Sequence, residues 1–154
     1  MKVVIAITAF AFAVAAGAAE PVYNEAADAK GEINVALAQA AAAKVTVLVI
    51  FGANWCGDCK ALDAALHQGR AAPLVAREFR VVKVNVGRFD RNVDLAESYG
   101  VPLKQGIPAV AVLSSRNEVL YVTRAGELAD ARSMGESGIY EFFKLVVDRG
   151  KPKP

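Results

Sequence analysis

The sequence predicts an α/β fold in which helices flank a central mixed β-sheet within a single domain. Two apolar, largely β-branched runs, at 45–51 and 81–86, are typical of strands buried inside a sheet. A helical segment lies between them, so a right-handed crossover makes them parallel neighbours. Residues 109–113 and 119–123 are expected to pair as a hairpin, because the polar stretch 114–118 separates them. With 154 residues and 55% hydrophobic content, the chain favours one domain around one core.

Helices are predicted where apolar residues recur three or four positions apart and turn residues mark the ends. They are expected at 24–43, 60–66, 73–79, 92–99 and around an apolar stripe formed by Ile139, Phe142, Phe143 and Val146. Asp90 is the predicted N-cap of the fourth helix, and Gly100 ends it. Residues 126–138 contain several Gly and Ser residues and charges of both signs, which indicates an irregular insertion with a short helix.

The N-terminus predicts a secretory signal peptide at 1–18, followed by the domain at 19–154. A short positive start precedes an apolar run at 3–16 that is too short for a comfortable bilayer crossing, and small residues follow it. Cleavage is expected after Ala18, with an uncleaved membrane anchor as the alternative. We therefore expect the mature protein in the periplasm or outside the cell, without stable membrane insertion.

Cys56 and Cys59 are the only cysteines, and they lie between the end of the first predicted strand and the start of the helix that follows it. Unpaired N–H groups and the positive end of the helix dipole stabilise a thiolate at such a place. A structural disulfide usually closes a longer loop, so a redox pair is the favoured interpretation and a structural bridge is the alternative. Zinc needs about four ligands. The one histidine, His67, is interpreted as a surface residue at a helix end, so no metal site is expected within one chain.

The motif Trp-Cys-Gly-Asp-Cys-Lys at 55–60 and the segment Gly-Ile-Pro-Ala at 106–109 resemble the thioredoxin superfamily. The wider stretch 51–63 is similar to the secreted bacterial thioredoxin-like or disulfide-isomerase-like branch of that superfamily. The resemblance implies a thioredoxin fold whose core spans about 32–148. It also implies a cis peptide bond before Pro108, which would pack against the disulfide.

The resemblance further implies a role for each residue around the motif. Cys56 would be the exposed attacking thiol, and Cys59 the more buried resolving thiol. Trp55 would shield the disulfide and offer an apolar contact to substrate, with a plain packing role as the alternative. Ile107 and Pro108 would present backbone with which an extended substrate chain can pair.

Three further positions bear on the chemistry. Gly57 and Asp58 separate the cysteines, and the Asp58 carboxylate is expected to oppose the helix dipole and disfavour the thiolate. Thioredoxins usually carry a buried acid six residues before the first cysteine, but this chain has Ile50 there, so its proton acceptor is unidentified. Lys83 lies where thioredoxins have a lysine near the redox pair, with an ordinary surface lysine as the alternative.

The sequence therefore predicts an exported thiol–disulfide oxidoreductase that reduces or isomerises protein disulfides through Cys56 and Cys59. Because the Asp58 carboxylate is expected to disfavour the thiolate, the protein is expected to act as a reductant or isomerase and not as a strong oxidant. The alternative is a non-catalytic thioredoxin-fold binding module in which the disulfide only locks the loop. The expected partners are proteins with thiols or disulfides and an unknown redox partner. No cofactor is expected beyond the redox-active disulfide, and a net charge of +2 gives no basis for nucleic-acid binding.

Overall fold

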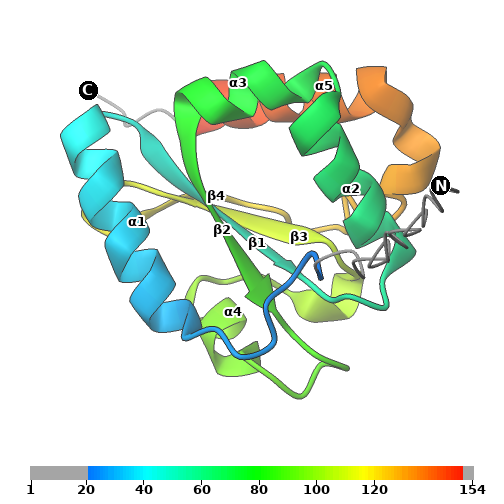
Figure 1. Ribbon diagram of the computed structural model, residues 1–154, viewed down its shortest axis with the longest axis horizontal. Coiled ribbons are helices and arrows are strands. Elements are labelled where there is room, and N and C mark those ends of the chain that lie inside the picture. The colour runs from blue at the N-terminus through cyan, green and yellow to red at the C-terminus, as the bar shows by residue number, and fades with distance from the viewer. Residues whose placement is uncertain (1–20, 151–154) are drawn as a thin grey trace, which may run out of the picture.

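The structure, a computed structural model, describes residues 21–150 and contains a four-stranded mixed β-sheet in that part of the chain (Figure 1). The strand order is β2-β1-β3-β4. β1 runs parallel to β2, and β3 is antiparallel to β4, as the sequence predicts; β1 is also antiparallel to β3. The strands are β1 (Thr46–Gly52), β2 (Phe79–Asn85), β3 (Ala109–Leu113) and β4 (Val119–Val122).

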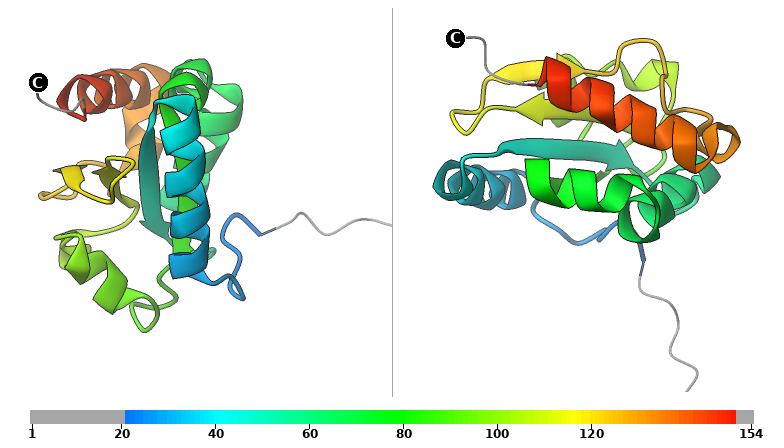
Figure 2. Two further views of the ribbon diagram at one scale, coloured as in Figure 1. Left: turned by 90° about the vertical axis from the view of Figure 1, so that its left-hand side faces the viewer. Right: turned by 90° about the horizontal axis from the view of Figure 1, so that it is seen from above.

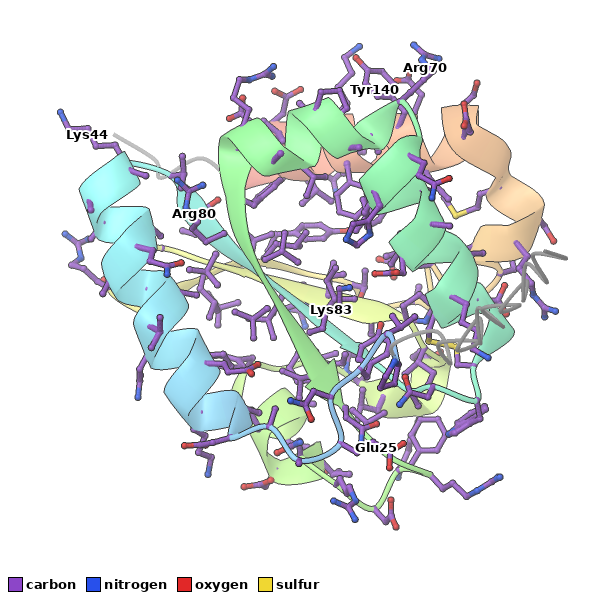
Figure 3. All side chains as sticks on the ribbon, in the orientation of Figure 1. Glu25, Lys44, Arg70, Arg80, Lys83 and Tyr140 are labelled. Atoms are coloured by element: carbon purple, nitrogen blue, oxygen red, sulfur yellow. A yellow bond between two sulfur atoms is a disulfide. The ribbon has the colours of Figure 1, made fainter. Side chains whose placement is uncertain are left out.

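Helices cover both faces of this sheet. They are α1 (Ala29–Ala43), α2 (Gly57–Gln68), α3 (Ala71–Glu78), α4 (Val93–Ser98), the short 3-10 helix η1 (Leu103–Gln105) and α5 (Ala131–Arg149). Buried residues of α1 and α4, with Cys59 of α2, share one core cluster, and Leu62 of α2 shares the other with the buried residues of α3 and α5. Figure 2 shows α2, α3 and α5 lying together. Between α3 and α5, the Arg70 guanidinium carbon lies 4.4 Å from the centroid of the Tyr140 ring (Figure 3).

β1 is the centre of the core because both of its faces are covered. Val47, Val49 and Phe51 point into the cluster that contains α1. Leu48 and Ile50 point into the cluster that contains α2, α3 and α5. This alternation explains why the sequence of the strand is an unbroken apolar run, and it fixes the end of β1 as the rigid base of the loop that follows.

The predicted starts of α1 and α2 and the predicted N-cap of α4 are wrong: α2 begins at Gly57 instead of residue 60. α1 begins at Ala29 instead of residue 24, because the Asp28 carboxylate accepts a hydrogen bond from Gly31 N at 3.1 Å and so caps the helix there. α4 begins at Val93, with Asn92 rather than Asp90 at the N-cap position. The Asp90 carboxylate instead accepts a hydrogen bond from Arg88 N at 2.9 Å within the preceding loop.

The insertion at 126–138 is partly helical and lies at the end of the sheet where β1 stops. α5 begins at Ala131, and a kink at Gly135 (φ 62°, ψ 178°) turns its first residues toward α2. Only glycine adopts that backbone conformation readily. Within the part of the chain that the structure describes, no helix is long and apolar enough to span a bilayer.

Candidate active site

The two cysteines form a disulfide at the N-terminal end of α2, drawn in yellow in Figure 3. Their Cα atoms are 5.2 Å apart. Cys56 occupies the N-cap position, and its sulfur accepts a hydrogen bond from Cys59 N at 3.1 Å. The sulfur therefore satisfies one of the free N–H groups of the first helical turn, which is the interaction that stabilises a thiolate at a helix N-terminus.

Both cysteines are buried in this disulfide form. Cys56 is 5% exposed and Cys59 is fully covered, so the expectation that Cys56 is exposed is wrong, although Cys59 is the more buried of the two. The reason is the loop before β3, which lies against the disulfide: Cys56 Sγ is 3.6 Å from the Ile107 carbonyl oxygen. The Ile107–Pro108 peptide bond is cis, in agreement with the resemblance.

Trp55 is one of the large apolar side chains left exposed, at 49%. Its indole Nε1 donates a hydrogen bond of 2.7 Å to the Gly87 carbonyl oxygen. The Phe89 ring packs edge-on against it, with centroids 6.1 Å apart, and Phe89 is itself 45% exposed. The Arg88 guanidinium lies 5.9 Å from the indole centroid. Two aromatic rings and one cation thus form an exposed surface next to the disulfide.

The Asp58 carboxylate is not the uncompensated charge that the sequence predicts. Arg132, at the start of α5, binds it with Nε and Nη2, each at 3.1 Å, and its backbone N–H adds a third hydrogen bond at 3.0 Å. The Arg132 side-chain hydrogen bonds are the main reason that the pKa of Asp58 is lowered. A Cβ on Gly57 would lie 3.2 Å from the same guanidinium, so α5 closes over the motif.

Lys83 is not an ordinary surface lysine. It lies on β2 directly opposite Ile50, the position where thioredoxins carry a buried acid (Figure 3). Its ammonium group forms an ion pair with Asp63 of α2, and only 29% of the Lys83 side chain is exposed. The backbone oxygen of Asp63 also forms a hydrogen bond with His67 Nδ1, at 2.8 Å. The His67 side chain is 60% exposed, as expected for a surface residue.

Tyr23 is a residue of this site that the sequence gives no reason to select. It precedes α1 in the N-terminal segment and is 1% exposed. Asn54, in the loop before Cys56, accepts from Tyr23 N at 2.9 Å and donates to the Tyr23 carbonyl oxygen at 2.8 Å. A Cβ added to Gly52 would collide with the Tyr23 hydroxyl and lie 3.0 Å from Cys59 Sγ. The hydroxyl therefore lies in the same small space as the buried sulfur.

The described residues hold no cluster of three or more His, Cys, Asp and Glu side chains that could bind a metal ion. The site offers two sulfurs, together with the polar groups of Tyr23, Asp63 and Lys83.

Known proteins resemble the chain over the same region. The sequence model of the family described as Thioredoxin-like matches residues 28–115, which include both cysteines and Pro108. A thioredoxin from Buchnera aphidicola subsp. Baizongia pistaciae (strain Bp) is 33% identical over 90 residues, covering 56% of this chain and 70% of that protein. A solved structure of a disulphide isomerase from Xylella fastidiosa Temecula1 is 46% identical, with a TM-score of 0.80, over 84% of this chain and 98% of that chain.

Proposed function

Because the chain belongs to the Thioredoxin-like family, we propose that it is exported and that it reduces or isomerises disulfide bonds in other exported proteins. The chain is a thiol–disulfide oxidoreductase, by its family, its likeness to a disulphide isomerase and its Cys56–Cys59 pair. The finer proposal concerns the substrate class, the compartment and the role of each cysteine.

Cys56 is the attacking thiol. Cys56 lies at the N-cap of α2, where the helix N–H groups favour the thiolate once the disulfide is reduced. The thiolate attacks one sulfur of a substrate disulfide, so that a mixed disulfide forms and the other substrate sulfur leaves as a thiolate. Cys59 then attacks Cys56 Sγ, the protein disulfide forms again and the second substrate thiolate is released. In isomerisation, a substrate thiolate attacks the mixed disulfide instead and Cys56 leaves reduced.

The observation that supports this proposal most directly is the position of the disulfide between a helix N-terminus and the Ile107 backbone. The Ile107 carbonyl oxygen lies 3.6 Å from Cys56 Sγ, so an extended substrate segment that pairs with this backbone brings its own sulfur to Cys56. Trp55 and Phe89 add an exposed apolar surface on which neighbouring substrate side chains can pack.

Export is proposed from the N-terminal sequence. The predicted signal peptide at 1–18 lies outside the described residues, and the remaining chain, 19–154, is proposed to work in the periplasm or outside the cell. In such an oxidising compartment the pair is oxidised unless a partner reduces it, so a dedicated electron donor is part of the proposal.

Trapping of substrates tests the proposal. In Cys59→Ser, a mixed disulfide on Cys56 cannot be resolved internally, so exported proteins should remain linked to Cys56 and be released by dithiothreitol. The matched control, Cys56→Ser, should trap few or none. A pair that dithiothreitol does not reduce in the folded wild type, together with an empty trap, would favour the non-catalytic binding module instead.

A further inference from the structure

We propose that the Tyr23 hydroxyl donates a hydrogen bond to the Cys59 sulfur of the reduced protein. The N-terminal segment 21–28 thereby completes a site that lacks the usual buried acid at position 50. The inference rests on the proposed function, because Cys59 must lose a proton only if it resolves mixed disulfides.

The argument begins with the close approach at Gly52. The space that a Cβ would take there is occupied by the Tyr23 hydroxyl, and Cys59 Sγ lies 3.0 Å from the same point. Tyr23 is held by both of its backbone polar groups through Asn54, two residues before Cys56. The hydroxyl is consequently fixed beside the sulfur by the same loop that carries the redox pair.

The environment of Tyr23 makes it a donor and not a base. Burial, and then the negative charge of Asp63, raise the pKa of Tyr23 well above its usual value. The phenol therefore stays neutral in the pH range where thiols ionise. A neutral O–H that donates a hydrogen bond to a buried sulfur favours the thiolate, which burial alone would disfavour.

Asp63 places its negative charge near Tyr23 from α2. It follows Cys59 by one helical turn, at the i+4 position, so both side chains lie on the same side of α2. Lys83 reaches it from β2, where its cross-strand neighbour is the apolar Ile50. The lysine thus pairs with a carboxylate supplied by the helix in a fold that has no acid on the adjacent strand.

The resolving step can be written with its protons and electrons balanced. The Cys59 thiol releases its proton to solvent, and the Tyr23 hydroxyl donates its hydrogen bond to the thiolate that forms. The Cys59 thiolate then attacks Cys56 Sγ, the bond between Cys56 and the substrate sulfur breaks, and the Cys56–Cys59 bond forms. The substrate leaves as a thiolate and takes a proton from solvent, which balances the proton that Cys59 released. Two protein thiols are oxidised, and one substrate disulfide is reduced to two thiols.

Replacement of Tyr23 by Phe isolates the donor because it changes no charge. The ionisable groups around Cys59 otherwise stay as they are; they are Cys56, Asp58, Asp63 and His67 of α2, Lys83 of β2 and Arg132 of α5. Any change in the titration of Cys59 can then be assigned to the loss of one hydroxyl.

The experiment measures two steps separately in the full chain. In a Cys56→Ser background, Tyr23→Phe should raise the pH midpoint of Cys59 ionisation, followed by thiolate absorbance, by about one unit, since a hydrogen bond to a charged group has about that strength. With both cysteines present, release of a substrate thiol from the mixed disulfide should slow about tenfold at neutral pH. Formation of the mixed disulfide in a Cys59→Ser background should be unchanged.

Tyr99→Phe is the matched control, because its hydroxyl bonds Asn117 at 3.0 Å on another part of the surface. An unchanged Cys59 midpoint in folded Tyr23→Phe overturns the inference while leaving the trap on Cys56, and hence the proposed function, intact. Absence of any mixed disulfide in Cys59→Ser counts against the proposed function instead. If Tyr23→Phe does not fold, Asn54→Ala frees the backbone of the segment and should raise the same midpoint; no rise in that variant also overturns the inference.

Discussion

At the scale of single residues, Asp58 and Arg132 together determine the charge next to the redox pair. The carboxylate alone would repel the Cys56 thiolate, but the guanidinium binds it at two nitrogens and compensates that charge. The thiolate is therefore less disfavoured than the motif suggests, and Asp58 loses much of its value as an argument for a strongly reducing protein. The pair instead makes the reactivity of Cys56 depend on a residue of α5.

Variants of Asp58 and of Arg132 should change the alkylation rate of Cys56 in opposite directions. Arg132→Met leaves the carboxylate uncompensated, so iodoacetamide should alkylate Cys56 of the reduced protein about twofold more slowly near its pKa, an effect of the size expected for exposed charges. Asp58→Asn leaves the cation, so alkylation should become faster and the protein more oxidising in glutathione buffers. Equal rates in both variants and the wild type would mean that the pair is only structural.

Gly52 is required by its neighbours and not by its own backbone angles. Gly52→Ala places a methyl group against the Tyr23 hydroxyl and 3.0 Å from Cys59 Sγ, so the free energy of unfolding should fall by about 1–3 kcal/mol. Urea unfolding with the disulfide intact measures this loss. Gly57→Ala is the control: its nearest atoms belong to the flexible end of Arg132, so the loss should be smaller. Equal losses would contradict the packing described for Tyr23.

At the scale of elements, the kink in α5 is what lets one helix both fill the core and reach the active site. Ile139, Phe143 and Val146 are buried against the sheet after the kink. Arg132 lies before it, at the N-terminus of α2. The stripe after Gly138 predicts only the first of these tasks, because the second depends on a change of direction at Gly135.

Gly135→Ala tests this view of α5. No atom lies within 4 Å of the added Cβ, so the cost is that of the backbone conformation alone, about 1–3 kcal/mol. If the kink relaxes, Arg132 should leave Asp58, and alkylation of Cys56 should slow as in Arg132→Met. Gly138→Ala, in the regular part of the helix, is the comparison variant. Loss of stability with unchanged alkylation would show that the first turn keeps its place without the kink.

At the scale of the whole molecule, the site is assembled from segments that the fold brings to one end of the sheet. The segment 21–28, the β1–α2 loop, β2, the loop before β3 and the first turn of α5 each contribute at least one group. Such an assembly ties the ionisation of its groups to the stability of the entire fold.

The stability of the protein should therefore fall at both extremes of pH. Asp58 has a lowered pKa in the folded state, so its contribution is present above about pH 4 and is lost as the pH falls through the lowered value. Tyr23 has a raised pKa, so its unfolded form binds fewer protons above about pH 10 and stability falls as the pH rises further.

Urea midpoints across pH measure both effects. Tyr23→Phe should flatten the alkaline limb, whereas Tyr121→Phe, at a half-buried tyrosine with a raised pKa, should flatten it less. Arg132→Met should flatten the acid limb, because it removes the main cause of the lowered Asp58 pKa. An alkaline limb unchanged in Tyr23→Phe would mean that Tyr23 ionises in the folded protein as it does in the unfolded chain.

The strand set, the mixed sheet and the place of the cysteines at a helix N-terminus could be predicted from the residues, whereas the cis bond before Pro108 was implied only by the family resemblance. These features depend on local order along the chain: apolar runs, turn residues and a spacing of three between two cysteines. Strands β3 and β2 lie within two residues of their predicted bounds for the same reason. The signal peptide and the export that it implies stay predictions.

Only the tertiary structure decided which groups surround the sulfurs. Arg132 lies 74 residues from Asp58 in sequence, and Tyr23 lies 31 residues from the Asn54 that holds it. Asp63 could have been suspected from its i+4 spacing to Cys59, but its pairing with Lys83 depends on the packing that brings this side of α2 within reach of β2. The interaction of charged groups and hydroxyls depends on their distance in space. The packing of the core sets the distance between segments that are far apart in sequence, and no periodicity along the chain encodes it.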